Sequence, residues 1–226
     1  MPQKDYILRL IEEFVQILAQ VTGLRRTGRL EAALDLLDRS AARFAGLRLR
    51  QLDTLPWDSL RVLLTVGGSL DVQQSVFLAE LRRLEGDIRE ERTGGGAGLS
   101  SSVLALRLYM EVVASRGLQA LEERREQALE LADRLRSQPL DPDVRLALWR
   151  FELAAGRFGR AEDALFTVLD ERPGDPAVID EGIAAYDALL DRDDEELEAG
   201  GLPRDEVLDG LARLGELRGE SGASRS

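Results

Sequence analysis

The chemistry open to this chain rests on carboxylates, arginines, hydroxyl groups, three tyrosines and a single lysine, Lys4. The sequence contains neither histidine nor cysteine. The commonest general base and the commonest metal ligands are therefore missing. Thiolate nucleophiles, disulfides and cysteine-based zinc sites are excluded as well. We expect no cofactor and no transition metal, and the composition favours a protein that is not an enzyme.

A glycine-rich segment, residues 94–98, comes directly before a serine run, residues 100–102. A loop of this kind at a helix N-terminus can hold a phosphate group. The nucleotide-binding form also needs a lysine just before Ser or Thr, and Lys4 is far away in the sequence. We interpret the segment as a flexible linker followed by a serine that caps a helix.

Residues 191–196 contain five carboxylates in six positions. Calcium is bound by such oxygen ligands, but a calcium-binding loop needs glycine at its sixth position, where Glu196 stands. We interpret the cluster as a solvated helix end. The carboxylates in question are Asp191, Asp193, Asp194, Glu195 and Glu196.

Several arginines and one tryptophan are candidate contacts for a partner. Clustered arginines bind carboxylates or phosphates, and a tryptophan near a linker can anchor an interface. A second arginine pair, residues 124 and 125, has the same character, whereas Trp149 lies among apolar helical positions and is expected in the core. The candidate partner contacts are Trp57, Arg25, Arg26 and Arg29.

The net charge of −12 is unevenly distributed. Residues 1–160 hold 24 basic against 23 acidic residues, whereas residues 161–226 hold 6 against 19. This acidic part repels nucleic acid and anionic membranes, and it could attract a basic partner. A solvated acidic surface that keeps the protein soluble explains the same charge. We expect no nucleic-acid partner and no membrane partner.

Apolar residues recur at helical spacing along the whole chain, and no strand-like alternation is present. Hydrophobic residues make up 44% and charged residues 32%, as in a globular protein. The sequence predicts an all-α protein with at least eight helices and no sheet. The expected helices are 4–26, 29–45, 58–66, 72–92, 99–115, 118–137, 142–155, 158–171, 176–190 and a weaker one at 203–217.

The expected domain organisation is a helical domain over residues 1–200, followed by a weak terminal helix and disordered tail at 201–226. A sub-boundary is expected at the glycine-rich residues 93–98. No stretch reaches the roughly 18 apolar residues of a spanning helix. The first helix is amphipathic and carries Asp5, Glu12 and Glu13, unlike a signal peptide. We therefore expect a cytoplasmic protein.

Residues 142–175, PDVRLALWRFELAAGRFGRAEDALFTVLDERPGD, resemble one tetratricopeptide repeat. Gly156 sits at the turn between the helices, and Ala161 is the small residue where they cross. Trp149 and Arg145 depart from the pattern. Residues 27–34 form a partial match in which Ala33 takes the place of the small residue. The other matching positions are Leu148, Leu165, Val168 and Pro173.

The opening KDYILRLIEEF and the following GRLEAALDLLDR also resemble a bacterial family of tetratricopeptide-like proteins with no assigned function. The resemblance implies antiparallel helix hairpins stacked as an α-solenoid. It implies no activity. The concave face of such a solenoid typically takes a peptide from a partner protein.

The first helix is apolar over more than half of its circumference, which favours a second burial surface. As a terminal repeat it has no preceding repeat to cover it, so we expect a homodimer. The competing explanation is a closed monomer in which the C-terminal helices fold back over the first helix. The candidate dimer contacts are Leu8, Val15 and Ile17. The preferred function is a non-enzymatic protein–protein interaction module. The alternatives are a self-associating structural homodimer and a carboxylate-based enzyme or small-ligand sensor.

Overall fold

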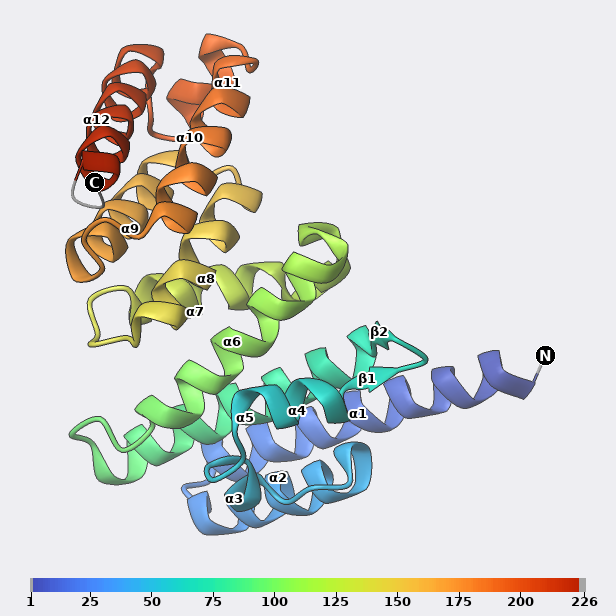
Figure 1. Ribbon diagram of the computed structural model, residues 1–226. Helices are drawn as coiled ribbons and strands as arrows, with labels where there is room; N and C mark the ends of the chain where they lie inside the picture. The colour runs from blue at the N-terminus through green and yellow to red at the C-terminus, as the bar shows by residue number, and fades with distance from the viewer. Residues whose placement is uncertain (1, 224–226) are drawn as a thin grey trace. The chain divides into compact units, whose positions relative to one another are not determined.

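The computed structural model describes the backbone of residues 2–223 and the side chains of residues 12–219. Within these limits the chain is almost wholly helical, with twelve α-helices (Figure 1). It divides into two compact units, residues 1–137 and residues 138–226. The glycine-rich segment lies inside the first unit, where it joins two packed helices.

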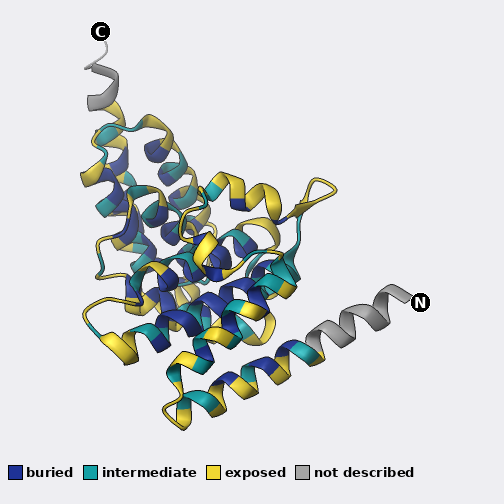
Figure 2. Cartoon of the chain, turned by 90° about the horizontal axis from the view of Figure 1, so that it is seen from below, coloured by how far each residue is buried: buried dark blue, intermediate teal, exposed yellow. Residues whose placement is uncertain are grey.

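Unit 1 begins with α1 (Pro2–Arg26), which is followed by α2 (Leu30–Ala45), the short α3 (Leu49–Leu52) and α4 (Trp57–Leu63). Its second half contains α5 (Val72–Thr93), α6 (Leu99–Arg116), a 3₁₀ helix (Leu118–Arg124) and α7 (Arg125–Leu135). Buried residues form stripes along the packed faces of these helices (Figure 2). The expected continuous helix at 118–137 is interrupted at Glu122, whose φ of 47° is not helical.

The prediction of no sheet was wrong for one short segment. Strands β1 (Thr65–Val66) and β2 (Ser69–Leu70) pair antiparallel, with Thr65 opposite Leu70. The expected helix 58–66 ends early at Leu63, and Gly67 and Gly68, which follow its expected end, form the two-residue turn with φ angles of 59° and 81°. A two-residue hairpin turn with positive φ at both positions favours glycine strongly. The strands are too short for the alternation that identifies a strand in a sequence.

Three phenylalanines join α1, α2 and α5 at the core of unit 1. The rings of Phe14 and Phe77 stack with centroids 4.1 Å apart, and Phe44 meets both rings edge-on. Phe14 is 2% exposed, so this contact fixes α1 against its neighbours. The stripe expected on the first helix therefore has its burial partner within the same chain.

Unit 2 contains five helices, α8 (Pro142–Ala154), α9 (Phe158–Glu171), α10 (Pro176–Leu190), α11 (Asp194–Ala199) and α12 (Arg204–Ala223). Gly156 takes the left-handed conformation, with φ of 73°, and lets α8 and α9 form a tight antiparallel pair. Asp175 caps α10 by accepting a hydrogen bond from the Ala177 amide at 3.0 Å. Asp141 stands at the equivalent position before α8 but makes no capping hydrogen bond with its side chain.

The core of unit 2 is built from the facing sides of α8, α9, α10 and α12. Trp149 is 1% exposed and belongs to this core, as expected. Ala161 is 1% exposed on α9, and Leu214 of α12 is fully buried. The terminal helix α12 is thus an integral part of the unit. It extends to Ala223, so most of the tail that we expected to be disordered is helical. Residues 224–226 lie outside the described part.

Between residues 2 and 223, no helix is both long enough and apolar enough to cross a membrane. Among the side chains that the structure describes, no group of three or more acidic residues has an arrangement that could hold a metal ion. Within the carboxylate run at 191–196, one side chain caps a helix. Asp193 caps α11 by accepting a hydrogen bond from the Glu196 amide at 2.7 Å.

Candidate binding site: an acidic groove between α9 and α12

A groove of about 450 Å³ lies on the surface of unit 2, between α9 and α12. Figure 1 shows α12, in red, beside α10 and above α9. The lining residues recur at helical spacing on each helix, so that each helix presents one face to the groove. The lining is formed by Glu162, Asp163, Phe166, Thr167 and Asp170 of α9 and by Glu206, Asp209, Gly210 and Arg213 of α12. We call this feature the acidic groove.

The lining carries five carboxylates and one arginine, a formal charge of −4. The charge of the whole unit has the same sign. Residues 138–226 hold 22 acidic and 10 basic residues, whereas residues 1–137 hold 20 of each. All of the net charge of −12 therefore belongs to unit 2. A concave surface lined by one sign of charge concentrates the field and attracts ligands of the opposite sign.

Phe166 supplies an apolar surface within this charged lining. The residue is 9% exposed and belongs to the core of unit 2. The guanidinium carbon of Arg213 lies 4.0 Å from the centroid of the Phe166 ring. This is the geometry of a cation–π contact. The groove thus combines an aromatic ring with carboxylates, the two kinds of group that bind organic cations.

Glu162 of α9 and Tyr186 of α10 form a polar contact at the wall of the groove. The Tyr186 hydroxyl donates a hydrogen bond of 2.9 Å to the Glu162 carboxylate. Burial raises the pKa of Tyr186, and the adjacent carboxylate raises it further, so the hydroxyl keeps its proton. Gly210 allows α12 to approach α10 closely, because a Cβ atom at this position would lie 2.3 Å from the Tyr186 ring.

Partial burial raises the pKa of the Glu162 carboxyl above its ordinary value. The charges of Glu206 and Asp163 raise it further, while the Tyr186 hydroxyl and Arg213 oppose the shift. The folded state therefore holds this proton more tightly than the unfolded chain. The contribution of Glu162 to stability is present at acidic pH and is lost as the pH rises through the raised pKa.

Replacing Glu162 with glutamine should consequently raise the melting temperature at pH 7, by about 1–2 °C. The amide can still accept the hydrogen bond from Tyr186 but carries no charge to desolvate. The gain over the wild type should shrink at pH 4, where the wild-type carboxyl is protonated. Thermal melts at both pH values measure this difference. Glu198→Gln on α11 is the matched control, and an equal gain at both pH values would contradict the assignment.

A second cluster of charged residues lies inside unit 1, along α5. Arg82, Glu80 and Glu85 have side chains that are only 1%, 1% and 3% exposed. Arg82 donates to Glu85 at 2.8 Å and to Asp53 at 2.6 Å, and Ser101 of α6 donates to Glu85 at 3.2 Å. We call these residues, with the partners described next, the α5 polar network.

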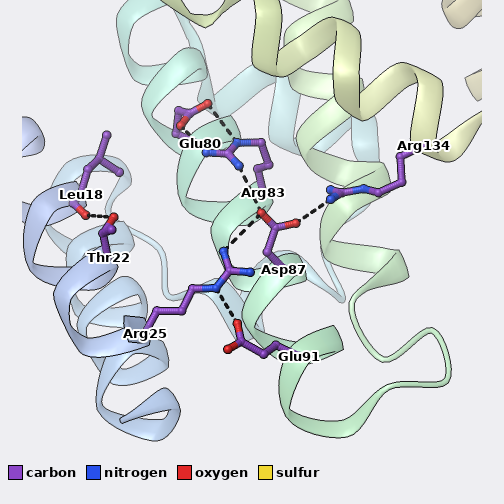
Figure 3. Close-up of polar contacts among 8 residues, drawn as sticks. All are labelled: Leu18, Thr22, Arg25, Glu80, Arg83, Asp87, Glu91 and Arg134. Carbon is purple, nitrogen blue, oxygen red and sulfur yellow. Dashed lines mark hydrogen bonds and ion pairs between the residues drawn. The ribbon is translucent and has the colours of Figure 1, made fainter. Parts of the chain in front are cut away.

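The remaining contacts of the α5 polar network join further helices of unit 1. Arg83 bridges Glu80 and Asp87, and Asp87 in turn pairs with Arg134 of α7 at 2.8 Å (Figure 3). Tyr109 of α6 donates a hydrogen bond to Glu80, and burial raises the Tyr109 pKa so that the proton stays on the hydroxyl. Each carboxylate of the network has a cationic or hydroxyl partner within unit 1. The network holds helices together and is not a binding surface.

The glycine-rich segment is more ordered in its contacts than the expected flexible linker. The Glu90 carboxylate accepts hydrogen bonds from the Gly96 and Gly98 amides at 3.2 and 3.3 Å. The backbone groups that could bind an anion are therefore directed at a carboxylate of the chain itself. Gly98, rather than a serine, stands at the N-cap of α6.

The structure separates the arginines and the tryptophan that the sequence suggested as partner contacts. Arg25 pairs with Glu91 at 2.5 Å and lies 3.9 Å from Asp87, which ties α1 to α5 (Figure 3). Arg26 and Arg29 are exposed at the turn between α1 and α2. Trp57 is half-buried beside Arg107, whose guanidinium carbon lies 4.4 Å from the ring. None of these four residues lines the acidic groove.

The three candidate dimer contacts have different environments. Val15 is 53% exposed on α1, whereas Ile17 is 8% exposed and lies near Leu36 and Ser40 of α2. The side chain of Leu8 lies outside the described residues. Part of the wide apolar face of α1 is thus used for packing within unit 1.

The sequence does not predict the acidic groove as a site, although it shows the acidic charge of residues 161–226. The acidic residues of α9 at positions 162, 163 and 170 do not form a run, and Phe166 stands between them. These residues share a face only when their spacing is placed on a helix. The groove also needs α12, which is far from α9 in the sequence. A signal was available in α12, where positions 206, 209, 210 and 213 follow the i, i+3, i+4, i+7 pattern.

Comparison with known proteins identifies a family but no activity. No curated protein and no solved structure matches the chain. Residues 1–219 match the model of a family described as "Family of unknown function (DUF6483)". This match covers all of unit 1 and nearly all of unit 2. The chain therefore belongs to the DUF6483 family.

Proposed function

We propose that this protein is a non-enzymatic interaction module that binds a basic segment of a partner protein in the acidic groove. The observation that carries the proposal is the lining itself, which contains five carboxylates and one aromatic ring. Lysine and arginine side chains are the protein groups that complement such a surface. The groove lies at the surface between two helices, where an extended peptide segment can reach it.

The helix pair α8–α9 supports an adaptor role of the tetratricopeptide kind. Ala161, the small residue that the repeat pattern expects at the helix crossing, is buried, as are Leu148 and Leu165 at core positions of that pattern. Gly156 supplies the left-handed turn. Repeats of this type present helix faces to peptides. In unit 2 the acidic groove lies between α9, the second helix of this pair, and α12.

The probe for the proposal is a fluorescein-labelled peptide of four Gly-Arg-Ser repeats. We expect it to bind the wild-type protein at low ionic strength, as followed by fluorescence anisotropy, and to dissociate when salt is added. The double substitution Asp170→Asn, Asp209→Asn removes two charges from the groove. It should weaken binding about tenfold, because two ion-pair contacts of about 0.5–1 kcal/mol each are lost.

The matched control neutralises two carboxylates of the same unit outside the groove, Glu195→Gln and Glu198→Gln on α11. This variant has the same net charge as the groove variant, so it should bind nearly as well as the wild type. Equal weakening in both variants would show that net charge alone attracts the peptide. Absence of wild-type binding at low salt would refute the proposed function.

A further inference from the structure

We infer that Arg213 occupies a guanidinium subsite of the acidic groove, and that the natural ligand displaces it with an arginine of its own. This inference rests on the proposed function and specifies both its ligand and its regulation. The subsite is the face of Phe166 within the carboxylate lining. The chain itself shows which chemical group the subsite accepts, because a guanidinium already lies there.

The position of Phe166 explains why the subsite is selective. Phe166 is buried among the core residues of unit 2 and also lines the groove, and Arg213, another lining residue, covers the face of its ring. A planar, weakly hydrated guanidinium stacks well on such a face, whereas an ammonium group keeps its water more strongly. Carboxylates of the same lining complete the environment of the cation. The subsite should therefore prefer arginine to lysine.

The position of Arg213 explains why it would act as a competitor. The residue is exposed, and its contact with the ring is of a kind that shifts an equilibrium only about two- to fivefold. Arg213 also carries the one positive charge in the lining, and it is close enough to Glu162 to oppose the rise in that group's pKa. An incoming arginine must both displace this side chain and approach its charge. Arg213 therefore lowers the affinity of the groove for cationic ligands.

Three substitutions test the inference with the peptide of four Gly-Arg-Ser repeats and a matched peptide of four Gly-Lys-Ser repeats. Arg213→Gln should bind the arginine peptide about five- to tenfold more tightly than the wild type, because both the competitor and its charge are removed. Arg213→Lys keeps the charge but stacks less well, so its gain should be smaller. Phe166→Leu keeps an apolar core residue and should abolish the preference for arginine over lysine.

The control for charge is Arg218→Gln, which removes a positive charge from the same helix. Arg218 pairs with Asp180 and does not line the groove, so affinity should stay within about twofold of the wild type. Melting temperatures of all variants show whether the fold is kept. Arg213→Gln that melts like the wild type and binds more tightly than Arg218→Gln supports the inference.

The failures of the two proposals can be distinguished. If charge removal at Asp170 and Asp209 weakens binding but Arg213→Gln weakens it too, Arg213 contacts the ligand directly and the displacement inference is overturned. An equal gain in Arg213→Gln and Arg218→Gln overturns it as well, because only net charge would matter. If no variant and no wild-type protein binds either peptide, both proposals are wrong.

Discussion

Replacing Glu85 with leucine should lower the free energy of unfolding by about 3–5 kcal/mol, a large effect for a single substitution. The Glu85 side chain is 3% exposed and accepts hydrogen bonds from Arg82, Arg89 and Ser101. Without this carboxylate, Arg82 keeps its buried charge and loses a partner at 2.8 Å. Removing one member of a buried pair is costly because the other charge stays desolvated.

Urea unfolding of the wild type and three variants measures this effect. The double variant Arg82→Met, Glu85→Leu should recover a large part of the loss, because no unpaired charge remains at these two positions. Glu91→Gln is the surface control. It breaks the exposed pair with Arg25 and should cost less than about 1 kcal/mol. A Glu85→Leu variant as stable as the Glu91→Gln variant would show that the α5 polar network does not stabilise unit 1.

Replacing Gly98 with alanine should destabilise unit 1 by about 3 kcal/mol, the second large effect. Gly98 lies where the start of α6 closely approaches α5. A Cβ atom at Gly98 would lie 2.0 Å from the carbonyl oxygen of Gly86, and the atom in the way is backbone. No rotation of a side chain can relieve such a clash, so α6 must shift away from α5. That shift would also strain the nearby contact between Ser101 and Glu85.

The matched control for Gly98 is a helical glycine with free space around it. A Cβ atom added at Gly23 of α1 would have no neighbouring atom within 4 Å. Gly23→Ala should stabilise the protein by about 0.5–1 kcal/mol, because alanine is the better helix former. Thermal and urea unfolding of the two variants give the comparison. A Gly98→Ala variant as stable as the wild type would contradict the close approach of α5 and α6.

The helical class and most of the helix ends were predictable from local signals in the sequence. Gly156 was expected at a turn between helices, and Gly28 lies between the expected helices 4–26 and 29–45; both adopt positive φ angles. The segment around Gly67 and Gly68 was predicted incorrectly, because a pair of glycines ends a helix or turns a hairpin equally well. Strands of two residues are too short for their alternation to decide between these outcomes.

The contacts that define the candidate site were not predictable, because they join segments far apart in the sequence. The acidic character of residues 161–226 was evident, but the placement of α12 beside α9 depends on long-range core packing, such as that of Leu214 in the core of unit 2. The buried charges of α5 were hidden for a related reason. The spacing of Arg82 and Glu85 is that of an ion pair on an exposed helix, but both residues are buried in the structure.

Hydrogen–deuterium exchange with and without the peptide of four Gly-Arg-Ser repeats tests the central claim most directly, because it shows where on the chain a basic segment binds. We predict slower exchange in α9 and α12, centred on the lining of the acidic groove, and unchanged exchange in α2, α5 and α6 of unit 1. The Asp170→Asn, Asp209→Asn variant should lose this protection under the same conditions. Protection that appears outside α9 and α12, or that persists in the variant, would contradict the assignment of the acidic groove as the binding site.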